Sequence, residues 1–242
     1  MSSPDSGLVV ALDGPGSSGK SSVGSAAALR LGYRFCDTGL LYRAATWLAL
    51  ERGVATDGTA GDPDRLVGLI TEIELVADGN GRLAHVSVDG VDVTDAVHTP
   101  RVDDAVSAVS GVPELRTALL DRQRALAAEP GGIVMAGRDI GTVVLPDADL
   151  KIFLDASVEE RGRRRAEERG VDPDSADGRA ILAQLQRRDV LDSTRAVAPL
   201  RPAPDAVHIV TDGNAFEQTV DAVVAAIRSA AAESTPVNGR SK

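Results

Sequence analysis

The segment LVVALDGPGSSGKSS, residues 8–22, joins a short apolar strand to a glycine-rich turn and then to an Ala-rich helical pattern. Residues 14–21 match G-x-x-x-x-G-K-[ST], and the strand before and the helix after are the context that this phosphate-binding motif requires. The glycines let backbone N–H groups converge on phosphate oxygens, and the helix beginning near Lys20 adds the positive end of its dipole. We therefore expect the loop to bind the phosphates of ATP through Gly14, Pro15, Gly16, Ser17, Ser18, Gly19, Lys20, Ser21 and Ser22.

We expect specific roles for two side chains of this loop. Lys20 is expected to bridge the outer phosphates, and Ser21 is placed to ligate the Mg²⁺ that arrives with the nucleotide as MgATP. Without a ligand we expect the Lys20 side chain to be solvated, so its replacement should leave the fold intact.

Beyond the loop, short β-branched runs alternate with helix-length amphipathic segments, which is the pattern of parallel strands joined by crossover helices. The pattern predicts an α/β fold, a five-stranded parallel sheet with helices on both faces. The strand candidates are residues 8–13, 33–37, 132–137, 150–154 and 206–211. Residues 73–94 instead alternate apolar and polar positions around a Gly-Asn-Gly turn, which predicts an antiparallel hairpin in a small inserted subdomain.

Composition restricts the class of protein. The 242 residues are 43% hydrophobic and 26% charged, enough for one domain with insertions or for two domains. The formal net charge of −10 argues against a nucleic-acid partner. Cys36 is the sole cysteine, which fits a reducing compartment, and the apolar run 8–12 is too short for a signal or membrane helix. We expect a cytoplasmic, soluble monomer without a nucleic-acid, membrane or protein partner.

Triphosphate binding does not identify the reaction, because switches, motors and kinases share this loop. A guanine-specific switch needs an N-K-x-D motif, yet none of Asn80, Asn214 and Asn238 is followed by lysine. No strand candidate ends in the Asp-Glu pair typical of motor ATPases. A small-molecule kinase instead needs a second anionic pocket beside the loop, with cations that offset two phosphate groups brought together.

Three groups of arginines could form that pocket. Arg43 follows the second strand candidate, and Arg138 and Asp139 follow the third, at the carboxyl ends where open α/β sheets bind ligands. Taken singly, each of these residues could be an ordinary loop charge. The three groups together favour the kinase.

The third group lies at the end of a helical pattern. Arg188, Asp192 and Arg195 are spaced i, i+4 and i+7, which puts two guanidinium groups and a carboxylate on one helix face, although a surface ion-pair ladder would have the same spacing. A further basic run within residues 159–170 reads as a solvated, salt-bridged helix or as a second insertion. Its arginines are Arg161, Arg163, Arg164, Arg165 and Arg169.

The motifs GPGSSGKSS, DTGLLYR, AGRDIGTVV, KIFLDAS and RRDVLDSTRAVAPL together resemble the bacterial cytidylate kinase family, in the family's order and over residues 8 to about 227. The resemblance implies a P-loop NTPase fold with an enlarged nucleoside-monophosphate (NMP) subdomain, which the hairpin fits, and a small helical lid. It predicts these boundaries: core 7–62, NMP-binding subdomain with insert 63–115, core 116–155, lid 156–175, core 176–228 and a disordered tail 229–242.

The resemblance also assigns roles to individual residues. It implies ATP-dependent phosphorylation of CMP and dCMP, with UMP or dephospho-coenzyme A as alternative acceptors, and a nucleotide-hydrolysing switch as a further alternative. The implied sugar contacts are Thr38, Arg188 and Asp192. The implied contacts to the acceptor phosphate are Arg43, Arg138 and Arg195. The base would be read by Ser107, Arg116 and Asp139, of which Ser107 and Arg116 rest on weaker local similarity.

Base selectivity and catalysis follow from this chemistry. The exocyclic amine of cytosine donates to a carboxylate such as Asp139, whereas uracil would direct an oxygen at it, so a preference for CMP over UMP is expected. Phosphoryl transfer mainly requires alignment and charge stabilisation, so we expect no general base and instead catalysis by Lys20, Mg²⁺, Arg138 and Arg195. We further expect Arg163, Arg164 or a neighbour to act as an internal arginine finger from the lid.

Overall fold

The computed structural model describes residues 7–56 and 59–234. Its elements, in chain order, are β1 (Val9–Asp13), α1 (Lys20–Leu31), β2 (Arg34–Asp37), α2 (Gly39–Glu51), α3 (Pro63–Leu69), η1 (Ile70–Glu72), β3 (Ile73–Ala77), β4 (Arg82–Val88), β5 (Val91–Asp92), η2 (Ala96–His98), α4 (Pro100–Ser110), α5 (Pro113–Ala128), β6 (Ile133–Gly137), the π-helical turn η3 (Ile140–Val144), β7 (Leu150–Asp155), α6 (Val158–Glu168), α7 (Ala176–Thr194), β8 (Val207–Val210) and α8 (Phe216–Ser234).

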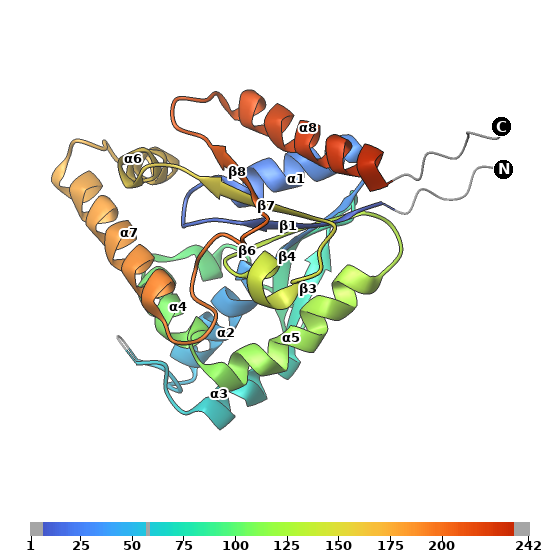
Figure 1. The fold of residues 1–242 in the computed structure, drawn as a ribbon. Helices are drawn as coiled ribbons and strands as arrows, with labels where there is room; N and C mark the ends of the chain where they lie inside the picture. Colours follow the sequence, from blue (N-terminus) through green and yellow to red (C-terminus); the bar gives the residue numbers. More distant parts are fainter. Residues whose placement is uncertain (1–6, 57–58, 235–242) are drawn as a thin grey trace, which may run out of the picture.

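The five predicted parallel strands are neighbours in one sheet and extend to its β8 edge. Their order is β2-β6-β1-β7-β8, and each neighbouring pair runs parallel. Strand β1 is flanked on both sides, so the loop that follows it emerges in the middle of the carboxyl edge. The α/β class and the helices on both faces are confirmed, with α1 and α8 on one face and α5 on the other (Figure 1).

Alternation of side chains along β1 explains the two layers. Val10 and Leu12 are buried in the cluster that includes α1 and α8, whereas Ala11 belongs to the cluster on the opposite face. Because successive strand residues point to opposite faces, a buried strand with two covered faces needs a continuous apolar sequence. The run LVVAL at residues 8–12 satisfies this requirement.

The predicted hairpin forms, but it belongs to the main sheet. Strands β3 and β4 pair antiparallel, while β4 also pairs parallel with β2, with Phe35 opposite Arg82 and Cys36 opposite Leu83. Within the described residues the sheet therefore has eight strands: β3 forms one edge, and the short β5 pairs with the end of β4 on the side opposite to β3. The local alternation predicts the turn and the antiparallel pair, whereas the contact with β2 depends on the packing of the whole chain.

A separate apolar core holds the elements on the hairpin side of the molecule. It combines residues of α2, α3, α4, α5 and the hairpin, including Leu41, Leu66, Val86, Val106 and Leu115. Since α2 lies before residue 63 and α5 continues past residue 115, this core does not divide the chain at those positions, and the domain boundaries stay predictions.

The tail prediction is wrong for residues 229–234. Helix α8 continues to Ser234, because this stretch is rich in alanine, the residue with the highest helix propensity. Ala230 and Ala231 also pack against the central core. Residues 235–242 lie outside the described part of the chain. None of the helices that the structure describes combines the length and the apolar character needed to span a membrane.

Candidate active site

The glycine loop between β1 and α1 requires its glycines for steric reasons. Gly14 has φ 154° and Gly19 has φ 93°, conformations that side chains rarely adopt. A Cβ atom on Gly14 would lie 2.1 Å from the carbonyl oxygen of Leu154. The loop is thus pressed against β7, with its backbone turned toward the carboxyl edge of the sheet.

The Lys20 side chain is buried rather than solvated, which corrects our expectation. Its exposed fraction is 6%, and Nζ donates to the carbonyl oxygen of Pro15 at 2.6 Å and to Ser18 Oγ at 3.3 Å. The loop itself supplies the acceptors that phosphate oxygens would otherwise offer. Burial, together with the nearby charge of Arg138, lowers the pKa of Lys20 well below its ordinary value.

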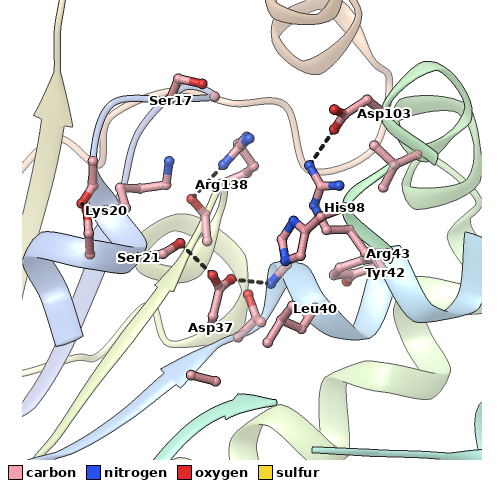
Figure 2. A pocket seen from close by; sticks show the side chains of 18 of the residues that line it. Ser17, Lys20, Ser21, Asp37, Leu40, Tyr42, Arg43, His98, Asp103 and Arg138 are labelled. Atoms are coloured by element: carbon pink, nitrogen blue, oxygen red, sulfur yellow. Dashed lines mark hydrogen bonds and ion pairs between the residues drawn. The ribbon is translucent and has the colours of Figure 1, made fainter. Parts of the chain in front are cut away.

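The glycine loop and the residues predicted to bind the acceptor line one cavity of about 790 Å³ at the carboxyl edge of the sheet (Figure 2). Most predicted site residues line it: Gly16, Ser17, Gly19, Lys20, Ser21, Ser22, Thr38, Arg43, Arg116, Arg138, Asp139, Arg164, Arg188, Asp192 and Arg195. Gly14, Pro15, Ser18 and Ser107 are not part of its lining, although Ser107 Oγ donates to Asp192 Oδ1 at 2.9 Å. The structure therefore brings together residues that are more than 170 positions apart in the sequence.

Arg138 lies between the glycine loop and Asp192 of α7. Its Nε donates to Asp192 Oδ2 at 3.2 Å, and a Cβ placed on Gly16 would lie 3.6 Å from its Nη2. This guanidinium group can therefore reach anions on both sides of the cavity. Burial would raise the pKa of Asp192, but Arg138 and Arg188 hold it below its ordinary value, so this carboxyl group is ionised near neutral pH.

Asp139, Arg116 and Arg195 form a buried group at the inner end of the cavity. Arg116 Nη2 donates to Asp139 Oδ2, and Arg195 Nη2 lies 3.5 Å from Asp139 Oδ1. The guanidinium of Arg116 also lies over the Tyr42 ring, 5.2 Å from its centroid. A planar heterocycle entering here would meet one carboxylate acceptor and several donors.

Two arginines in the cavity hold donors that no protein atom satisfies. Arg188 Nε and Arg195 Nη2 are buried without a hydrogen-bond partner. Burial and the neighbouring guanidinium groups lower the pKa of both side chains, that of Arg188 to about 10. Buried, unpaired donors are costly, so their presence in a cavity indicates a site for an anionic or strongly accepting ligand.

The helical repeat of α6 directs the arginines of its basic run to different surroundings. Arg163 is half exposed and pairs with Glu160 and Glu167 of its own helix, so the structure does not place it in the cavity, contrary to our expectation. Arg164, which does line the cavity, donates to the Thr211 hydroxyl and carbonyl oxygen. Arg165 lines the cavity as well.

Arg161 has a structural position that the sequence did not indicate. Its side chain is 5% exposed, and it donates to the carbonyl oxygens of Ala156 and Gly16 and to Asp189 Oδ2. It therefore connects α6 to both the glycine loop and α7.

Three carboxylates at the site were missed by the sequence reasoning. Asp37 accepts from the Ser21 hydroxyl (Figure 2). Asp13 accepts from the backbone N–H groups of Ile140 at 2.8 Å and Gly141 at 2.7 Å, and burial raises its pKa to about 6. Both carboxylates end a parallel strand, a signal that could have found them. Asp103, on α4, gave no such signal.

Comparison with known proteins identifies the family. The chain matches the model of the cytidylate kinase family over residues 10–229. It is 46% identical over 219 residues to a protein named cytidylate kinase from Nocardia farcinica, a match that covers 90% of this chain and 93% of its relative. A protein of the same name from Rhodococcus opacus is 50% identical over 206 residues, or 85% of this chain and 88% of the relative.

Among solved structures, an uncharacterized protein from Eubacterium ventriosum superimposes with a TM-score of 0.50 at 15% identity, covering 92% of this chain and 98% of that one, which bears on the fold alone. The sequence relatives decide the question, because they match along nearly their whole length. On this evidence the chain belongs to the cytidylate kinase family.

Proposed function

We infer that this chain transfers the terminal phosphoryl group of ATP directly to CMP, and also to dCMP. One observation carries the inference: the glycine loop and a set of buried arginines with unfilled donors line the same cavity. A donor and an acceptor phosphate can meet there in line, with guanidinium groups offsetting their combined charge. The family membership supports the same reaction.

On the donor side, the loop from Gly14 to Ser22 would hold the phosphates of ATP. Lys20 would exchange its contact with the Pro15 carbonyl oxygen for the outer phosphates, so it is stored in the loop before the nucleotide arrives.

The donor site also suits Mg²⁺. The hydroxyl of Ser21 and the carboxylate of Asp37 are in contact, and oxygen donors are those that Mg²⁺ prefers. Among the described residues no cluster of three or more His, Cys, Asp or Glu side chains could hold a metal ion, so the phosphates would have to supply further ligands. Bound there, Mg²⁺ would neutralise charge on the transferred group.

On the acceptor side, we assign Arg43, Arg138 and Arg195 to the phosphate of CMP. The sugar would contact Thr38, Arg188 and Asp192. Asp192 already accepts from Ser107 and Arg138, and its remaining acceptor capacity suits a sugar hydroxyl.

We assign the base to Asp139, Arg116 and Ser107. Asp139 would accept from the exocyclic amine of cytosine, while Arg116 would donate to its ring nitrogen or carbonyl oxygen. The carboxylate would face the oxygen of uracil instead, so CMP is favoured over UMP.

We assign the arginine finger to Arg164 or Arg165, the two arginines of α6 that line the cavity. Arg163 would have to leave Glu160 and Glu167 and turn to the other side of its helix to reach the cavity. Closing the lid would also exclude water and suppress hydrolysis of ATP.

A coupled ADP-release assay with CMP, dCMP, UMP, AMP, shikimate and dephospho-coenzyme A tests the function. We expect rapid ADP release with CMP and dCMP, much slower release with UMP, and background release with the remaining compounds. ADP release that is independent of any acceptor would instead indicate a nucleotide-hydrolysing switch, and preference for another acceptor would overturn the assignment.

A further inference from the structure

Asp103 accepts from four guanidinium groups: one each from α2, α6 and α7, and that of Arg169, which directly follows α6. Its Oδ1 accepts from Arg43 Nη2 at 2.6 Å and from Arg188 Nη1 at 3.4 Å. Its Oδ2 accepts from Arg165 Nη2 at 2.8 Å and from Arg169 Nη2. The Asp103 side chain is only 5% exposed and lines the cavity, where Figure 2 shows it meeting Arg43. No motif in the sequence marks this residue.

The four arginines depend on Asp103 to different degrees. Arg43 also donates to the Val97 carbonyl oxygen, and Arg188 has Asp192 within 3.8 Å. Without Asp103, Arg43 therefore keeps a hydrogen bond and Arg188 keeps a long ion pair.

The two arginines of the lid have no comparable second anchor. Within the described residues, the remaining ion pair of Arg165 is with Glu168 of the same helix, and the guanidinium of Arg169 forms an ion pair with Asp103 alone. Asp103 is thus the link between these two lid residues and α4.

The two halves of α6 are attached to the protein by different contacts. Arg161 and Arg164 attach the first half to the glycine loop, α7 and Thr211. The second half reaches the acceptor side through Arg165 and Arg169, both on Asp103. Ala166 packs in the interior and stays in place, so loss of the carboxylate should loosen the second half of α6 and leave the first half unchanged.

We propose that Asp103 is a positioning residue, a fixed anion that binds Arg165 and Arg169 and thereby holds the second half of the lid helix over the acceptor pocket. The inference rests on the proposed function of that pocket. Each guanidinium carries five N–H donors, so the lid arginines can keep Asp103 and still offer donors to the transferred phosphate. The surrounding arginines also hold the pKa of Asp103 at about 2, against the effect of burial, so the anion persists at neutral pH.

The test compares Asp103→Asn with Asp104→Asn. The two substitutions remove the same charge from adjacent residues, but Asp104 is exposed and contacts Gln184. In the substrate-free Asp103→Asn protein, the rate of amide hydrogen exchange should rise at least about fivefold over residues 165–171 and stay unchanged over residues 158–164. In Asp104→Asn the exchange rates should be unchanged throughout. A fivefold rise corresponds to roughly 1 kcal/mol of lost local stability.

Steady-state kinetics give a second readout. For Asp103→Asn we expect kcat to fall on the order of tenfold while the KM for CMP stays within about twofold, since Arg43 and Arg188 keep their other partners. Exchange identical to that of Asp104→Asn would overturn the proposal. A raised KM with unchanged kcat would also overturn it, because Asp103 would then serve acceptor binding.

A second variant tests the proposal in case the Asp103→Asn protein does not fold. Arg169→Gln removes one contact from the partly exposed end of the lid helix, and it should raise exchange in the same segment; exchange at the wild-type level would overturn the proposal. The exchange measurement uses no nucleotide, so it can fail while CMP phosphorylation is confirmed, and the reverse also holds.

Discussion

Replacement of Asp139 by asparagine tests how the base is read, because it keeps the shape and removes the charge. The Asp139 side chain is 5% exposed, with Arg116 on one oxygen and Arg195 3.5 Å from the other. In the variant, we expect the amide oxygen to take the place of Oδ2 and accept from Arg116, so that the amide N–H₂ takes the place of Oδ1. The N–H₂ is then directed at the ligand, where it suits the oxygen of uracil and opposes the amine of cytosine.

The size of the effect follows from the bond that is lost. A hydrogen bond to a buried charged group contributes about 1.5–3 kcal/mol, which corresponds to roughly a 10- to 150-fold decrease in kcat/KM for CMP. UMP gains a donor in place of a repelling carboxylate, so its kcat/KM should not decrease. The ratio of kcat/KM for CMP to kcat/KM for UMP should therefore fall by at least about tenfold, and on the order of 10²-fold if the full energy of the hydrogen bond is lost.

The assay is coupled ADP release at varied CMP and UMP with saturating ATP, for the wild type, Asp139→Asn and the exposed control Asp147→Asn. The KM for ATP should be unchanged in both variants, and melting temperatures will show whether each is folded. An unaltered ratio of the kcat/KM values for CMP and UMP in a folded Asp139→Asn protein would refute the base-reading model. Equal losses with both acceptors would assign Asp139 to a different role.

Three further outcomes are expected. Lys20→Met should lower kcat on the order of 10³-fold or more without lowering the melting temperature in a thermal-unfolding scan, because burial disfavours the charged ammonium group; near-normal turnover would refute its role. Asp192→Ala should raise the KM for CMP by about tenfold or more and leave the KM for ATP nearly unchanged, whereas equal effects on both substrates would remove Asp192 from the acceptor site. Asp13 has a folded-state pKa of about 6, above its ordinary 3.8, so its contribution to stability is present below about pH 4 and is lost as the pH rises through 6. Urea unfolding at pH 4–7 should show that the free energy of unfolding of the wild type falls by up to about 3 kcal/mol relative to that of Asp13→Asn, and parallel pH curves would contradict this.

The sequence by itself determined the features that depend on neighbouring residues. The run of apolar residues 8–12, the glycine loop and the helix after it specify a strand, a turn and an anion-binding helix end through local backbone preferences. The same holds for the other four parallel strands and for the hairpin around residues 78–81. Because parallel strands end at one edge, the positions of Arg43, Arg138 and Asp139 near the loop also followed from the sequence.

Tertiary structure decided which charges face one another. The helical repeat turns each residue of α6 by about 100° from the last, so adjacent arginines point to different surroundings, and only packing determines that Arg163 is outside while Arg165 is inside. Asp103 and Arg188 are 85 positions apart, and nothing local indicates that they meet. Burial of Lys20 and the pairing of β4 with β2 are likewise decided by long-range contacts, because desolvation and sheet extension depend on what the rest of the chain places beside them.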